Sequence, residues 1–413
     1  MEERKDEHEI VENPVEEIIN QDDILGEEVI NEHGEYMDED LEPEAGEDAE
    51  HEEGENQVIF EDDSVQGFFL HKEPVYSVSI NPKYPDLVVS GGGDDKGYLW
   101  NKATGDLVYP MEGHTDSVTS VGFSSDGTYI STAGMDGRLC VYKIEENLEV
   151  KPHCLFDENV GNEVQWTQWH QSGNIIAAGY SDSTIWLINA VHGSTLNVLS
   201  GIQSDTDLVT STTCGRFSNS GRTLVAGYSD GAVRVWGPST QTVVQKFLPN
   251  DKRNHQDSIT SIDISSDDQL IMTGSEDSTA KIFHASRGTV VATYQQNDGE
   301  SVECVGLQQN LAAAGTSDGQ LCVYDINTSR LRSRFLHEEA AAVTKLKWID
   351  SHLIVSSSAD GTVRVWDARS SDSKHAVREF KGHDDTVLDF DISPDGQHVV
   401  SGGDDGCCLV FML

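Results

Sequence analysis

The sequence predicts an all-β protein whose folded part is a β-propeller of eight blades. Three observations carry this prediction. First, a unit of about 40 to 50 residues repeats eight times after about Gln66. Second, each unit contains short apolar or alternating runs bounded by Gly, Asp and Ser, which is the pattern of β-strands joined by tight turns. Third, each unit has room for four strands, and a ring of four-stranded sheets is a propeller.

An acidic residue sets the register of the eight units. It lies at a turn in each unit, at intervals of 41 to 48 residues: Asp94, Asp136, Asp182, Asp230, Asp277, Asp318, Asp360 and Asp405. An aromatic residue follows six positions later in seven units, and only Ile188 in the third unit breaks this rule. Seven blades are therefore the alternative to eight, with the third unit as the degenerate one.

The strands of a unit follow in a constant order. An alternating stretch such as "SVTSVGF" predicts the first strand, and a turn such as "SSDG" closes it. An apolar run that ends in small residues, such as "LVVSGG", predicts a second strand that is crowded near an axis. The third strand follows the turn with the repeated Asp, and a weaker fourth strand such as "GDLVYPM" leads to the next unit.

The units resemble WD repeats. The resemblance rests on a His that opens a unit, as in "GHTDSV" (113–118) and "GHDDTV" (382–387), on the Asp of the later turn, and on the dipeptide Trp366-Asp367. A His opens five units: His71, His114, His255, His337 and His383. The resemblance implies that the His, a strand hydroxyl, the Asp and the aromatic residue form a stabilising hydrogen-bonded brace in each blade. Units three, four and six lack the His, and we expect weaker networks there.

The last unit lacks a fourth strand after its closing run, "SGGDDGCCLVFML". The resemblance implies that the segment before the first unit supplies this strand, and the candidate segments are Val65–Leu70 and Val58–Phe60. Such pairing covers an open sheet edge. The two acids in the closing run then differ in role. Asp405 is the repeated turn residue, whereas Asp404 is additional and is expected to face a ligand.

The first 63 residues differ from the rest of the chain in charge. They contain 28 acidic residues against only Arg4 and Lys5. Like charges at this density repel each other, and the segment has too few large apolar residues to offset the entropy of ordering. We therefore expect a disordered acidic tail over residues 1–63 and the propeller over residues 64–413. The tail either keeps the protein soluble or attracts a basic partner.

Composition and motifs argue against several classes of function. A formal net charge of −46 repels the phosphates of nucleic acid, so we expect no direct binding to it. The seven cysteines form no C-x-x-C pair, and no apolar run approaches the length of a membrane span. We expect a reduced, cytoplasmic protein, with the nucleus as a second compartment. No catalytic or phosphate-binding motif is present, so the sequence predicts a binding protein without enzymatic activity, cofactor or metal. We also expect a monomer.

The WD-repeat resemblance also implies where recognition occurs. In that family three positions per blade reach the upper face, two near the start of the first strand and one just before the turn Asp. Here these positions include four acids and no Lys or Arg, and the acids are Glu163, Glu276, Glu303 and Asp404. Adjoining loops add Asp116, Asp257, Asp384 and Asp385. The alternative is that a domain this acidic scatters acids over its whole surface.

Such a ring of acids predicts a partner of opposite charge. Arginine pairs bidentately with carboxylates, so we expect a Lys- and Arg-rich peptide to bind the ring. Aromatic rings attract the same cations, and Tyr76, Tyr180 and Tyr228 are the expected cation–π partners.

One family of WD-repeat proteins is similar in its whole layout. The similarity rests on the acidic N-terminus, the "GGGDDK" turn of the first unit and the "VLDFDISPDG" stretch of the last. That family contains the angio-associated migratory cell protein of animals and a fungal chaperone of a large-subunit ribosomal protein. The fungal branch implies a chaperone in 60S ribosome biogenesis that captures the basic N-terminal segment of that ribosomal protein. Two alternatives stay open: a scaffold in signalling or cell migration, and an adaptor for histones or a ubiquitin ligase.

Overall fold

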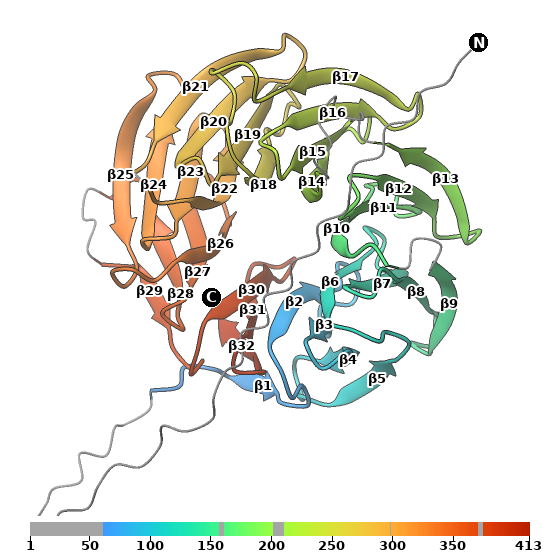
Figure 1. Ribbon diagram of the computed structural model, residues 1–413. Coiled ribbons are helices and arrows are strands. Elements are labelled where there is room, and N and C mark those ends of the chain that lie inside the picture. The colour runs from blue at the N-terminus through green and yellow to red at the C-terminus, as the bar shows by residue number, and fades with distance from the viewer. Residues whose placement is uncertain (1–60, 157–160, 201–209, 298, 371–374) are drawn as a thin grey trace, which may run out of the picture. The chain divides into compact units, whose positions relative to one another are not determined.

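The fold is an eight-bladed propeller. The computed structural model describes residues 61–156, 161–200, 210–297, 299–370 and 375–413, so the predicted tail lies outside the described residues up to residue 60. Within these ranges 32 β-strands pair into eight four-stranded antiparallel sheets. Each sheet is one blade, and the blades are arranged in a ring (Figure 1). The predicted number of eight blades is confirmed, and the degenerate third unit forms a complete blade.

Blades 1 to 4 take their strands in chain order from the axis outward. Blade 1 contains β2 (Val75–Ile80), β3 (Leu87–Gly92), β4 (Gly97–Asn101) and β5 (Leu107–Met111). Blade 2 contains β6 (Val118–Phe123), β7 (Tyr129–Gly134), β8 (Leu139–Ile144) and β9 (Val150–Phe156). Blade 3 contains β10 (Val164–Trp169), β11 (Ile175–Tyr180), β12 (Ile185–Asn189) and β13 (Ser194–Leu199). Blade 4 contains β14 (Thr212–Phe217), β15 (Leu224–Tyr228), β16 (Val233–Gly237) and β17 (Thr242–Phe247).

Blades 5 to 7 repeat this order, and blade 8 departs from it. Blade 5 contains β18 (Ile259–Ile264), β19 (Leu270–Ser275), β20 (Thr279–His284) and β21 (Thr289–Gln295). Blade 6 contains β22 (Val302–Gln308), β23 (Leu311–Thr316), β24 (Gln320–Asp325) and β25 (Arg330–Leu336). Blade 7 contains β26 (Val343–Trp348), β27 (Leu353–Ser358), β28 (Val363–Asp367) and β29 (Arg378–Phe380). Blade 8 contains β30 (Val387–Ile392), β31 (His398–Gly403), β32 (Cys408–Met412) and β1 (Gln66–Phe68).

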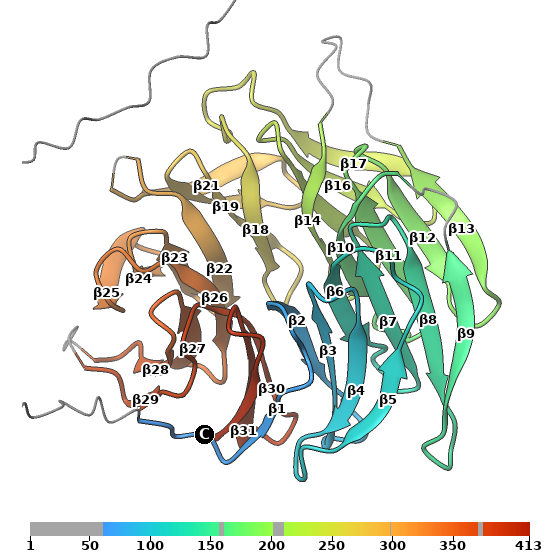
Figure 2. The same ribbon diagram turned by 60° about the horizontal axis from the view of Figure 1, so that its bottom comes forward.

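The N-terminal strand closes the ring. β1 pairs antiparallel with β32, and Gln66 lies opposite Val410. Phe68 is buried, and its ring stacks on Trp100 of blade 1 with 5.1 Å between centroids, so the strand also joins blade 8 to blade 1. Figure 2 shows β1 at the blade that contains β30 and β31, where it forms the outer edge beyond β32. The predicted closure by the segment Val65–Leu70 is thus confirmed, and the other candidate, Val58–Phe60, lies outside the described residues.

The small residues at the ends of the second strands are required by the neighbouring blade. A Cβ atom added to one of five glycines would lie 2.6 to 2.8 Å from the first residue of the next inner strand. The pairs are Gly402 with Val75, Gly91 with Val118, Gly227 with Ile259, Gly274 with Val302 and Gly315 with Val343. Carbon atoms do not approach so closely, so a larger residue would push the blades apart.

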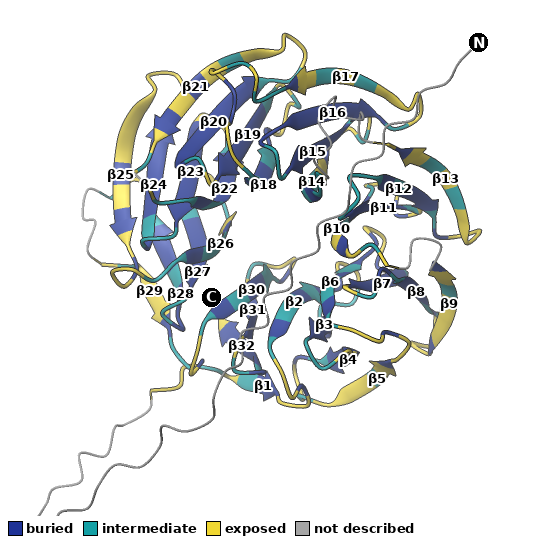
Figure 3. Cartoon of the chain, in the orientation of Figure 1, coloured by how far each residue is buried: buried dark blue, intermediate teal, exposed yellow. Residues whose placement is uncertain are grey.

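Burial falls from the middle of each blade to its outer edge. The second and third strands are almost wholly buried, as in β3 and β16, whereas alternate residues of outer strands such as β21 and β25 are exposed (Figure 3). The core therefore consists of side chains between neighbouring blades, and the outer strands form the wall. No helix among the described residues is long and apolar enough to cross a membrane.

Candidate binding face

A β-bulge interrupts the inner strand of every blade near its start. In each case one residue of the inner strand has no partner on the second strand: Tyr76, Thr119, Gln165, Thr213, Thr260, Glu303, Thr344 and Leu388. A bulge breaks the regular alternation of side chains and re-aims the side chain of the extra residue. These eight residues are among the positions that the WD-repeat resemblance assigned to the upper face.

A backbone hydrogen bond brings the other two sets of predicted positions together. In every blade the residue before the turn Asp donates its N–H to a carbonyl near the start of the inner strand, at 2.8 to 3.0 Å. In blade 8, for example, Asp404 donates to Thr386, and in blade 5 Glu276 donates to Ser258. We call the surface formed by these 24 positions, three per blade, the upper face.

The four predicted acids of the upper face come from four blades. Glu276 and Asp404 are exposed beside their turns in blades 5 and 8. Glu163 in blade 3 is also exposed, and it accepts a 3.0 Å hydrogen bond from Gln165. Glu303 in blade 6 is half-buried at its bulge and accepts a hydrogen bond from the Ser301 hydroxyl. The acids are thus spread around the ring rather than gathered in one blade.

The acids of the adjoining loops are exposed and oriented by their own backbone. The Oδ1 atoms of Asp116, Asp257 and Asp385 each accept the N–H of the next residue, at 2.7 to 2.9 Å. Asp384 is exposed beside Asp385, and its N–H donates to Asp405. Asp116, Asp257 and Asp385 each lie two residues after the opening His and therefore occupy equivalent places in blades 2, 5 and 8.

Two further acids lie on the same face. A Cβ atom at Gly93 would lie 3.1 Å from the Glu73 carboxylate and 3.4 Å from the half-buried ring of Tyr76, so all three residues are neighbours. Glu300 accepts a 2.8 Å hydrogen bond from Ser317, which precedes the turn Asp of blade 6. Sequence reasoning missed both acids, although each directly precedes a position assigned to the upper face.

Two of the three predicted cation–π partners are wrong. Tyr180 and Tyr228 end the second strands of blades 3 and 4, and both side chains are buried. The Arg234 guanidinium already covers the Tyr228 ring, 4.0 Å from its centroid. The second strand is packed on both sides by neighbouring blades, so its last residue points into the core. Tyr76 differs because the bulge turns it outward.

Three members of the predicted brace, the His, the strand hydroxyl and the turn Asp, meet in all five blades that begin with a His. Among the described residues the aromatic member joins them only in blade 7, where Trp366 donates to the Ser356 hydroxyl at 2.8 Å. Nδ1 of the His contacts the turn Asp at 2.9 to 3.3 Å, and Nε2 contacts a hydroxyl of the second strand at 2.7 to 2.9 Å. The groups are His71 with Asp94 and Ser90, His114 with Asp136 and Thr132, His255 with Asp277 and Thr273, His337 with Asp360 and Ser356, and His383 with Asp405 and Ser401. The ring nitrogens and hydroxyls of each group pair with one another inside their blade, which supports a structural role.

Burial and pairing shift the protonation of the brace. Burial raises the pKa of Asp277, but its hydrogen bonds to His255 and Thr279 outweigh that effect and hold the pKa well below its usual range. Burial lowers the pKa values of His255 and His337. The braces of blades 5 and 7 therefore combine a charged carboxylate with a neutral imidazole at neutral pH.

The blades without an opening His hold the turn Asp by other donors. In blade 6 the Asn297 side chain donates to Asp318 at 2.8 Å, close to where a His would lie. In blades 3 and 4, Asp182 and Asp230 accept the N–H of the residue two positions later, a bond that the turn Asp also accepts in blades with a His, such as Asp277 in blade 5. Blade 6 thus replaces the His with an amide.

The cations along the propeller axis are already paired. Lys347 contacts Asp391 at 2.8 Å, Arg216 contacts Asp263 at 3.2 Å, and Lys345 contacts Asp389. These pairs link neighbouring inner strands and leave little net positive charge in the channel. No group of three His, Cys, Asp or Glu side chains in the described ranges is arranged to hold a metal ion.

Comparison with known proteins agrees with the geometry. The model of the WD domain, G-beta repeat, matches residues 105–143, 193–237, 247–284 and 374–411. The model of the anaphase-promoting complex subunit 4 WD40 domain matches residues 307–392. WD-repeat propellers are generally scaffolds rather than catalysts.

Two curated proteins and one solved structure are similar over most of the chain. The human angio-associated migratory cell protein is 32% identical over 85% of this chain and 80% of its own length. The ribosome assembly protein SQT1 of Saccharomyces cerevisiae is 24% identical over 86% of this chain and 88% of its own. The crystal structure of Chaetomium thermophilum Sqt1 bound to the N-terminus of the ribosomal protein L10 superposes with a TM-score of 0.78 at 24% identity. That match covers 86% of this chain and all of the other. The chain therefore belongs to the WD-repeat β-propeller family and is a homologue of the angio-associated migratory cell protein.

Proposed function

We propose that this protein is a non-enzymatic chaperone in ribosome biogenesis. It captures the basic N-terminal segment of a large-subunit ribosomal protein on its upper face and keeps that segment soluble in the cytoplasm before assembly.

The observation that carries the proposal is the distribution of charge on the upper face. Three positions per blade converge there, and they include four acids and no Lys or Arg. Loop carboxylates such as Asp116 and Asp385 surround them. Such a surface repels nucleic acid and attracts a chain of arginines and lysines.

The relatives support the kind of partner. The crystallised Sqt1 holds the N-terminus of a ribosomal protein, and it shares the whole propeller architecture with this chain. Capture would begin with attraction by the acidic loops, which raises the association rate. Arginines would then pair with carboxylates of the inner rim, where half-buried Glu303 is shielded from water more than Glu276 or Asp404.

Charge reversal tests this proposal. In titration calorimetry with the Lys- and Arg-rich N-terminal peptide of L10, Glu303→Lys and Asp404→Lys are each expected to weaken binding about tenfold or more. Asp106→Lys is a matched control, because Asp106 is an exposed acid in the turn before β5, away from the upper face. Equal affinities for all four proteins would remove the upper face from the site.

Salt provides an independent test. Charge pairs at a surface are screened over about 10 Å at 0.1 M salt, so the affinity of the full chain for this peptide should fall steeply as salt rises. An affinity that does not change with salt would contradict an electrostatic capture.

A second candidate function is a scaffold in signalling or cell migration. It is favoured by the higher identity to the angio-associated migratory cell protein than to the yeast ribosome assembly protein. Affinity purification at low salt separates the two. One stoichiometric ribosomal protein supports the chaperone, whereas kinases, histones or cullin adaptors support a scaffold or adaptor.

A further inference from the structure

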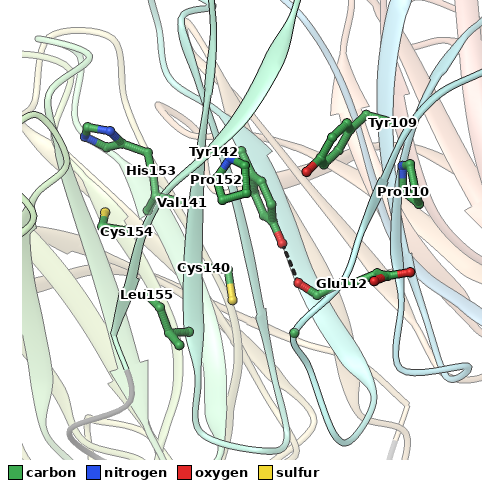
Figure 4. A pocket seen from close by; sticks show the side chains of 11 residues that line it. Tyr109, Pro110, Glu112, Cys140, Val141, Tyr142, Pro152, His153, Cys154 and Leu155 are labelled. Carbon is green, nitrogen blue, oxygen red and sulfur yellow. Dashed lines mark hydrogen bonds between the residues drawn. The ribbon is translucent and has the colours of Figure 1, made fainter.

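A groove lies in the outer wall between blades 1 and 2. It has a volume of about 590 Å³. Tyr109 and Pro110 of β5 form one side, and Pro152 and Leu155 of β9 form the other (Figure 4). We call it the blade 1–2 groove.

The lining of the groove is mainly apolar. Leu155 is half exposed, and the Tyr109 and Tyr142 rings meet at 6.1 Å between centroids. Two thiols also line it, and burial raises the pKa of Cys140 to about 12 and that of Cys154 to about 11, so both stay uncharged. The groove thus offers an apolar surface to a partner's side chain.

The two prolines limit what the groove accepts. Pro110 and Pro152 lie in β5 and β9, the outer strands of their blades. Proline has no N–H to donate, and in an edge strand it blocks the addition of another strand. The groove is therefore suited to a side chain rather than to a paired strand.

The lining of the groove contains one carboxylate, that of Glu112, and no Lys or Arg. The Tyr142 hydroxyl donates to the Glu112 carbonyl at 2.9 Å, and the side chain of Glu112 is exposed at that end. His153 contacts the carbonyl of Ala190. The Arg138 guanidinium donates to the Gly113 carbonyl at 2.8 Å and keeps its positive charge, so Glu112 supplies the acceptor for a partner's cation at this end. A carboxylate beside apolar walls fits an apolar residue that has a basic neighbour.

The groove is continuous with the upper face. Glu112 and Gly113 line its end, and the same loop continues through His114 to the exposed Asp116. A peptide chain that crosses Asp116 can therefore reach the groove over only a few residues.

We propose that the blade 1–2 groove binds one aromatic or large aliphatic side chain of the basic segment that the upper face captures. The inference rests on the proposed function and adds a second determinant to it. The carboxylates set the rate and orientation of capture, and the groove contributes apolar contact that salt does not screen. The partner segment therefore combines arginines and lysines with a large apolar residue at one end.

Paired peptides test the groove. The probes are one Lys- and Arg-rich peptide with alanines at both ends and two copies with a tryptophan at one end or the other. Against the full chain at high salt, one tryptophan peptide is expected to bind about tenfold more tightly than the alanine peptide, which is about 1.4 kcal/mol. Leu155→Asp and Tyr109→Ala are each expected to abolish this difference and to leave the alanine peptide unaffected.

Leu336→Asp is the matched control, because Leu336 is a leucine of similar exposure on the outer strand of blade 6. It should keep the tryptophan preference, and equal melting temperatures show that the variants remain folded. If the three peptides bind the wild-type protein equally, the groove inference is wrong while the proposed function stands. If the preference survives in both groove variants, the apolar site lies elsewhere. If no peptide binds even at low salt, the proposed function fails and the inference with it.

Discussion

Blades 7 and 4 share almost the same third-strand sequence, "DGTVRVW" and "DGAVRVW", yet their arginines have different surroundings. In blade 7, Arg364 pairs with Asp360 at 3.1 Å and with Glu379 of the outer strand at 2.7 Å. Asp360 also belongs to the brace with His337. The buried charges of blade 7 are therefore balanced.

In blade 4 the equivalent Arg234 is not balanced. Its side chain is 5% exposed, and its Nε and Nη1 atoms have no hydrogen-bond partner in the described part of the chain. Its neighbour on the outer strand is Lys246, where blade 7 has Glu379. Among the described residues, the Tyr228 ring lies against the guanidinium, 4.0 Å from the ring centroid. A repeat sequence therefore specifies the strand, whereas residues on other strands decide whether a buried charge is stabilised.

Removal of the turn Asp should give the largest difference in stability between variants of the two blades. Asp360→Ala leaves the His337 and Arg364 side chains without their carboxylate partner. We expect it to lower the free energy of unfolding by about 3 to 5 kcal/mol. Asp230→Ala removes one acceptor of a backbone N–H, and we expect a loss of about 1 kcal/mol. Urea denaturation of both variants measures the difference. Equal losses would mean that the brace adds nothing to blade 7.

Replacement of the two arginines should change the stability of the protein in different directions. Arg364→Met breaks two ion pairs, one of them partly exposed, and we expect a loss of about 2 kcal/mol. Arg234→Met removes a buried, poorly paired cation and keeps its volume, so stability should be unchanged or should rise. Thermal unfolding of both variants is the measurement. A large loss from Arg234→Met would show that its contact with Tyr228 is sufficient.

An exchange of the outer-strand residues should give Arg234 a carboxylate partner in blade 4 and remove one from Arg364 in blade 7. Lys246→Glu places a carboxylate opposite Arg234, and we expect stabilisation by about 1 kcal/mol. Glu379→Lys makes blade 7 like blade 4, and we expect a loss of similar size. Denaturation curves of the single and double variants give both values. No gain from Lys246→Glu would mean that the two side chains do not meet.

The smallest expected effect is on pH dependence. Burial lowers the pKa of His337 from its ordinary value of 6.5, so its contribution is complete above that pH and is lost as pH falls. Burial raises the pKa of Asp360, but hydrogen bonds, first that from His337, lower it overall, so its contribution is lost only below about 3.8. The melting temperature of His337→Gln should therefore fall less between about pH 7 and pH 5 than that of the wild type. Parallel curves would contradict a neutral, buried His337.

Much of the fold follows from local sequence. Eight repeats of strand and turn patterns, with Asp residues such as Asp94 and Asp405 in register, predict the number of blades because each turn depends on residues that are close in the chain. The WD-repeat resemblance implied the braces, and the His and Asp that carry it lie 22 or 23 residues apart in each of the five units. The closing strand was also predictable, because an unpaired edge after Leu409 needs a cover.

The candidate site was predictable only in part. Glu303 and Asp404 could be assigned to the upper face, because bulge and turn positions recur in every unit. Glu73 was missed although it precedes an assigned position, because its place beside Tyr76 depends on the loop that crosses from blade 8 to blade 1. Tyr180 and Tyr228 were assigned to the surface by their position beside a turn, and the packing of neighbouring blades buries both.

The sequence by itself determined the units, their number, the braces and the excess of acids. Only the tertiary structure decided which side chains of different blades meet, because those contacts join residues about 40 or more positions apart in the chain. The pairing of Lys345 with Asp389, the isolation of Arg234 and the groove between Tyr109 and Leu155 all arise in this way. Close packing between blades, rather than local propensity, sets their environment.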